Sequence, residues 1–171
     1  MSGTTTLAGI EVPSTDPIFV AIVFGVHIPL GLVCVTAGAT AMLMRKGRGR
    51  HSSAGTIYFW GLLALFLSAT VLAIMRWAEN YHLFILGLLS LIAGWLGRAA
   101  VRRHGPHWAK LHIAGMGSSY VLMLIAFYVD NGKQLPLWQS LPHFTYWLLP
   151  SAIGLPLIIH AMLRHPLAQG R

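Results

Sequence analysis

Histidine is the residue type in this sequence best suited to chemistry, because imidazole binds haem iron and transition metals. Five of the nine histidines are the candidate cofactor-binding residues: His27, His51, His82, His112 and His160. His27 lies well inside an apolar run, where an ionisable side chain is costly and is a functional candidate by default. The alternative is a neutral His27 that bonds a backbone carbonyl freed by the nearby Pro29. Haem b or a transition metal is therefore the candidate cofactor.

A second set of polar residues recurs along the segment from Lys110 to Asp130. At steps of three and four it places on one helical face His112, Gly115, Ser119, Met123, Ala126 and Asp130. A face turned toward lipid would not carry these groups, so we expect it to pack against other helices. Ser119, Tyr120 and Asp130 are candidates to line a polar pathway, and hydrogen bonding between helices is the alternative role for the serine and the tyrosine.

Catalytic residues are not assigned. The sequence has no glycine-rich phosphate loop, no HExxH motif and no pair of carboxylates inside an apolar segment. Its one cysteine, Cys34, excludes a disulfide within the chain. The pattern therefore does not decide whether the protein is an enzyme.

The elements that position these residues are membrane spans. Of 171 residues, 56% are hydrophobic and 9% are charged, whereas a soluble domain carries about 25% charged residues. The expected fold is an all-α, compact bundle of five transmembrane helices. The spans are expected at about residues 18–44, 54–75, 81–97, 108–129 and 144–163, between tails at 1–17 and 164–171. The first span is longer than the hydrocarbon core, so tilt, protrusion or a kink, for which Pro29 offers a site, must absorb the excess. Pro150 and Pro156 are expected to interrupt the fifth span.

The charges predict the orientation of the spans. Two basic loops and the C-terminal tail hold ten of the twelve lysines and arginines. All four acidic residues fall on the opposite side: Glu11, Asp16, Glu79 and Asp130. The positive-inside rule then places the N-terminus outside and the C-terminus in the cytoplasm. We expect the basic loops to contact anionic lipid headgroups and expect no nucleic-acid partner.

A faint internal repeat relates the first two hairpins. His27 precedes Arg45 by 18 residues and His82 precedes Arg98 by 16, and HSSAGTIY from His51 aligns with HIAGMGSSY from His112. Counted from the basic edge, His27 and His82 lie ~27 Å and ~24 Å deep. The repeat thus predicts an outer tier of histidines, His27 and His82. The predicted inner tier is His112 with His51 or His160. Coincidence is the alternative, since small residues and basic loops are common in membrane hairpins.

Several segments resemble a group of bacterial multi-pass membrane proteins catalogued as a domain of unknown function. The segments that carry the resemblance are HIAGMGSSY (residues 112–120), AFYVDNG (126–132), LPLW (135–138) and YWLLP (146–150). Ser52, directly after His51, departs from the resemblance, because a basic residue is expected at that position. The resemblance implies a location in the bacterial cytoplasmic membrane and supplies no activity.

Three functions of different classes remain open. The first is electron transfer through haem or a metal held by the two histidine tiers. The second is a pathway for protons or a small solute, with prolines opening backbone carbonyls toward a cavity. The third is an accessory subunit that docks on another membrane protein through its small-residue faces. A homodimer is compatible with the second function, because five spans are few for a transporter.

Overall fold

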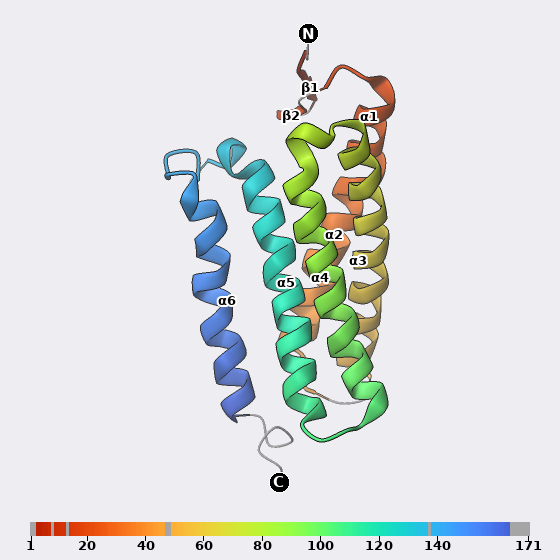
Figure 1. Cartoon of the computed structure of the whole chain (residues 1–171), viewed down its shortest axis with the longest axis vertical. Helices are drawn as coiled ribbons and strands as arrows, with labels where there is room; N and C mark the ends of the chain where they lie inside the picture. The colour runs from red at the N-terminus through yellow and green to blue at the C-terminus, as the bar shows by residue number, and fades with distance from the viewer. Residues whose placement is uncertain (1–2, 8, 13, 47–48, 137, 165–171) are drawn as a thin grey trace. The chain divides into compact units, whose positions relative to one another are not determined.

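The computed structural model describes residues 3–7, 9–12, 14–46, 49–136 and 138–164, and most of them are helical (Figure 1). Five described segments are long and apolar enough to cross a membrane: Pro17–Leu43, Arg50–Met75, Trp77–Arg103, Trp108–Gln134 and Phe144–Arg164. This confirms the predicted all-α class with five long apolar helices. The chain divides into two units, residues 1–84 and 85–171, and each is described by itself.

The first apolar segment of unit 1 contains a turn of π-helix. It consists of α1 (Pro17–Ile22), η1 (Val23–His27) and α2 (Ile28–Leu43). The backbone N–H of Ile28 bonds the carbonyl of Val23, five residues back. Pro29 has no N–H to continue the ladder, and a π turn is one way in which a helix absorbs such a disruption. The irregularity predicted at Pro29 therefore lies in the turn before it.

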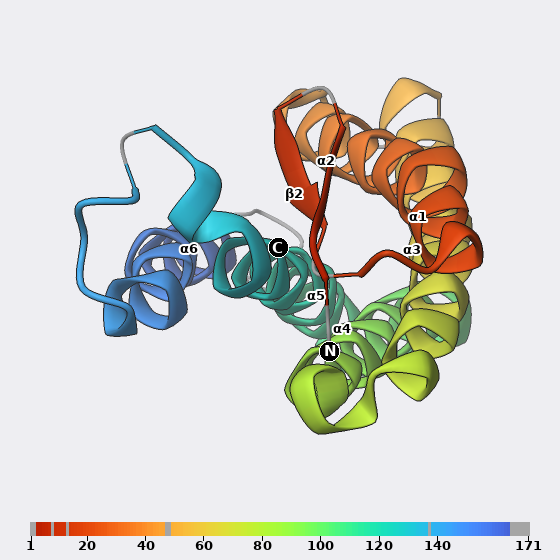
Figure 2. The same cartoon turned by 90° about the horizontal axis from the view of Figure 1, so that it is seen from above.

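The helix α2 packs on α3 (Arg50–Met75), and the two lie side by side in both views (Figures 1 and 2). Cys34 of α2 is completely buried, and Tyr58 of α3 is 2% exposed. A Cβ atom on Gly61 would lie 3.1 Å from Cys34 Sγ, which shows how closely the helices approach. Small residues at this depth therefore set the spacing of the pair.

A short β-hairpin precedes the first helix, where the sequence had predicted only a polar tail. β1 (Thr5–Leu7) pairs antiparallel with β2 (Ile10–Val12). Val12 packs in a cluster with Phe19 and Leu72, so the hairpin is tied to α1 and α3. Its strands are too short for the alternation of apolar residues to be recognised in the sequence.

Unit 2 contains the C-terminal part of α4 (Trp77–Arg103), then α5 (Trp108–Asn131), η2 (Gly132–Gln134) and α6 (Phe144–Arg164). A Cβ on Gly115 would lie 2.6 Å from the backbone of Gly97, so α4 and α5 touch at two glycines. α5 and α6 lie side by side in both views. There a Cβ on Gly154 would meet the side chain of Val121.

Two predictions about helix boundaries are wrong. The second and third spans were expected to be separated by residues 76–80, but only Arg76 leaves helical geometry and α4 begins at Trp77. Pro150 and Pro156 were expected to interrupt the fifth span, but α6 continues through both. An apolar helix tolerates proline when neighbouring groups satisfy the freed backbone. The expectation that proline breaks a helix therefore fails in α6.

Candidate functional site

His27 is the last residue of the π turn, and its ring is fixed by a serine on the facing helix. The distance between His27 Nδ1 and Ser68 Oγ is 2.9 Å. The hydroxyl of Ser68 donates to the carbonyl of Leu65 at 2.8 Å. Because a hydroxyl has one hydrogen, Ser68 must accept from His27, and Nδ1 therefore carries the proton. In the neutral ring the lone pair is then on Nε2, which is the atom able to bind iron or accept a proton.

The surroundings of this pair are mostly apolar. Ser68 is 8% exposed, and the ring of His27 is half-buried. The described acidic residues of unit 1 are Glu11, Asp16 and Glu79, at or beyond the ends of the helices that hold the pair. π turns within α-helices occur frequently at functional sites. An imidazole held in one orientation at such a turn is the strongest candidate site in unit 1.

His51, also predicted, caps the end of α2. Its Nδ1 donates to the carbonyl of Ala41 at 2.8 Å. Lys46 Nζ donates to the same carbonyl at 3.2 Å and to that of Met42 at 2.6 Å. Loss of water around its ammonium group lowers the pKa of Lys46. Two cationic or polar side chains thus satisfy carbonyls that the helix end leaves unbonded.

In unit 2, His112 makes the same kind of contact as His51. Its Nδ1 donates to the carbonyl of Gly97 at 3.0 Å. Each histidine lies in the first turns of one helix and bonds a carbonyl near the end of the helix before it. Ala41 and Gly97 follow His27 and His82 by 14 and 15 residues. This shared contact supports the predicted repeat.

The remaining candidates make other contacts or are exposed. The ring of His82 packs edge-on against Tyr81, with centroids 5.7 Å apart. His160 is exposed on α6, and Asp130 is exposed near the end of α5. Tyr120 is half-buried on α5. Among the described residues, no group of three or more His, Cys, Asp or Glu side chains is placed to hold a metal ion.

Ser119, predicted as part of a polar pathway, lies at a contact between helices. It is completely buried, and its carbonyl accepts the hydroxyl of Ser90 at 2.7 Å. The two hydroxyl oxygens are 3.5 Å apart. This geometry favours the alternative role of bonding α4 to α5.

Ser68 and Ser90 were not identified from the sequence. Each is a small polar residue in an apolar helix, and each is buried. Their partners lie on neighbouring helices, and the residue pattern of one helix does not determine which residues of the next helix face it.

The chain matches no protein-family model, no curated protein and no solved structure. The functional interpretation therefore depends on the residues and contacts described above.

Proposed function

We propose that this chain is a multi-pass protein of the bacterial cytoplasmic membrane, with its N-terminus outside and its C-terminus in the cytoplasm. Five apolar helices of sufficient length support the crossing. The gathering of lysine and arginine in alternate loops supports the orientation. The group that HIAGMGSSY and AFYVDNG resemble is the family to which we assign it.

Labelling of single cysteines tests this topology. In a Cys34→Ser background, Ser14→Cys should react with a membrane-impermeant maleimide in intact cells, whereas Ser53→Cys should react only after lysis. Ser14 lies before α1 and Ser53 in the first turn of α3, on opposite sides in the proposed orientation. Labelling of both positions from the same side would contradict it.

For the activity, we infer that His27 is an axial ligand of b-type haem and that the protein transfers electrons. The observation that carries this inference is the fixed tautomer of His27, with Nδ1 held by Ser68 and the lone pair on Nε2. Histidines that bind metals commonly donate their other ring nitrogen to an oxygen acceptor in this way. His82, in the same unit and at a similar counted depth, is the expected second ligand. His51 and His112 share the Nδ1 arrangement and, with His160, remain the proposed inner tier.

An optical spectrum of the purified full chain is the experiment that tests haem binding. We expect a Soret band in the wild-type protein and its loss in His27→Ala. Ser68→Ala should lower haem affinity by roughly tenfold or more, because the ring loses its anchor. His143→Ala is the matched control, since His143 is an exposed histidine just before α6. A wild-type protein without a Soret band, expressed with sufficient haem, would overturn the inference.

A second function, a proton or solute pathway, is favoured by the π turn itself. Backbone groups at such a turn are less tightly bonded than in a regular helix, and His27 lies at its end. In proteoliposomes, a pH gradient should then collapse faster with wild-type protein than with His27→Ala. Equal rates for the two proteins would eliminate this function.

A further inference from the structure

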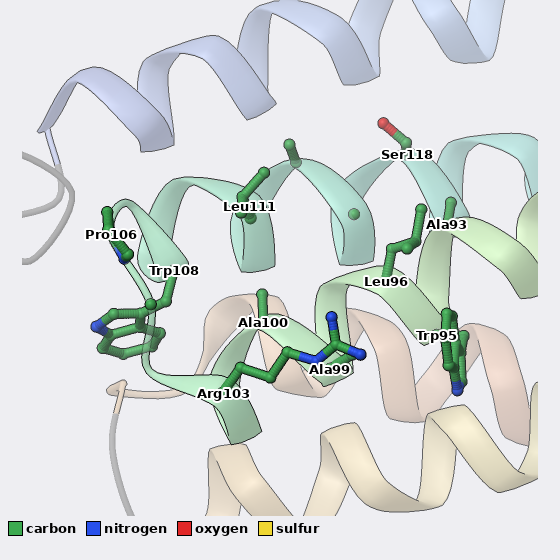
Figure 3. A pocket seen from close by; sticks show the side chains of 13 residues that line it. Ala93, Trp95, Leu96, Ala99, Ala100, Arg103, Pro106, Trp108, Leu111 and Ser118 are labelled. Atoms are coloured by element: carbon green, nitrogen blue, oxygen red, sulfur yellow. The ribbon is translucent and has the colours of Figure 1, made fainter.

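An apolar groove of about 480 Å³ lies in unit 2, where α4 and α5 approach the loop that joins them. We call it the α4–α5 groove; its lining runs from Ala93 to Arg103 on α4 and from Gly105 to Ser118 on the loop and α5. Figure 3 shows these side chains. All of them belong to one unit, so the groove is a feature of a single helix pair.

Small residues line much of the groove. Ala99 and Ala100 line it from α4, and Ala114 and Gly115 line it from α5. Larger residues at those positions would fill the space between the helices. The lining between the two helices therefore consists largely of small apolar groups.

The loop end of the groove is amphipathic. Trp108 lies at the loop end and Trp95 lies further along α4 (Figure 3). Tryptophan is enriched where a membrane meets water. The side chain of Arg103 runs along α4 toward Ala99, so its guanidinium group lies beside the apolar lining (Figure 3). A cation therefore borders the groove close to the loop.

The charge of Arg103 is not balanced by the part of the chain that the structure describes. The ion pair present in the described residues joins Arg76 to Glu79. Unit 2 has one acidic residue, Asp130, which lies at the C-terminal end of α5, away from the loop that joins α4 to α5. An anion that completes this site must therefore come from another molecule.

We propose that the α4–α5 groove binds an anionic phospholipid, with an acyl chain along the apolar lining and the phosphate on Arg103. This rests on the proposal that the chain spans a membrane, and it is independent of haem. Hydrocarbon chains are the solvent around a spanning helix, and phosphates lie at the depth where its basic loop begins. Arginine presents a planar fork of donors that matches phosphate oxygens. The groove thus complements both parts of the lipid.

Native mass spectrometry of the full chain in detergent tests the proposal, with phosphatidylglycerol and phosphatidylcholine of identical acyl chains as probes. We expect tighter binding of phosphatidylglycerol and a roughly tenfold loss of that preference in Arg103→Gln. Arg164→Gln is the matched control, because it removes an exposed arginine at the end of α6, outside the groove lining. Ala100→Leu should weaken the binding of both lipids by filling the groove.

Three results would overturn the proposal. One is equal binding of the two lipids by wild-type protein. Another is an equal loss of preference in Arg103→Gln and Arg164→Gln, which would indicate general surface charge. The third is a wild-type dimer that becomes monomeric in Ala100→Leu while lipid binding stays unchanged. That result would show that a second copy of the chain, and not a lipid, occupies the groove. Alkaline extraction distinguishes failure of the lipid-binding proposal from failure of the membrane-spanning proposal. A chain that stays in the membrane after extraction but shows no lipid preference contradicts only lipid binding in the groove.

Discussion

His27 donates from Nδ1 to the hydroxyl oxygen of Ser68 at 2.9 Å, which joins the π turn to the helix α3 that packs beside it. The bond has two consequences. It gives the ring N–H of His27 and the hydroxyl of Ser68 a hydrogen-bond partner in apolar surroundings, where water would otherwise be needed. It also fixes which ring nitrogen carries the proton. Stability and chemistry at this site therefore depend on the same contact.

Ser68→Ala should lower the free energy of unfolding by about 1 kcal/mol, because the Nδ1–H of His27 loses its acceptor. Unfolding in mixed micelles measures this change. Thr70→Val is the matched control: the Thr70 hydroxyl donates to Phe66 within its own helix, so its loss should cost less. In a double-mutant cycle with His27→Ala, additive effects would show that the two side chains do not interact.

Gly115→Ala should destabilise the protein by about 2 kcal/mol, because the helices must separate or distort to accept the new methyl group. Its Cβ would lie 2.6 Å from Gly97 Cα and 2.8 Å from the Ala93 carbonyl oxygen, and backbone atoms yield little. Gly55→Ala is the control, since its Cβ would have no neighbour within 4 Å. Thermal unfolding compares the two. A Gly115→Ala protein as stable as Gly55→Ala would mean that α4 and α5 are not in this contact.

Gly154→Ala should also destabilise the protein, but here a second substitution should restore stability. The clash is with one methyl group of the Val121 side chain. Val121→Ala removes that methyl, so the double variant should be more stable than Gly154→Ala alone. The same thermal unfolding measurement follows all three proteins. Purely additive losses would contradict the packing of α5 on α6 at this point.

Hydropathy predicts where apolar segments lie, but it does not predict where helices end. The span predicted at residues 81–97 belongs to a helix that continues to Arg103. Arginine is a good helix former, so the helix persists after hydrophobicity stops. Pro150 and Pro156 show the opposite failure, because a local breaker signal is overridden where the backbone must stay bonded.

The sequence predicted one of the two residues of the candidate site. His27 was identified by the cost of an imidazole in an apolar segment. Its partner Ser68 was not, because the pairing depends on the register between two helices, and the periodicity of one helix does not determine it. The clustering expected from two tiers of histidines also depended on counted depth alone. Depth orders residues along a span but does not determine which way they face.

His107→Gly should raise the free energy of unfolding by about 1 kcal/mol, because a left-handed backbone costs a side-chain-bearing residue roughly that amount. His107 has φ of 61° and precedes α5 directly. Its side chain makes no capping bond to the helix, so glycine removes strain without removing a contact of that kind. His107→Ala is the control: it keeps the Cβ and the strain, and it should give no gain. Thermal unfolding in detergent measures both variants. A loss of stability in His107→Gly but not in His107→Ala would show that the loop does not hold this conformation.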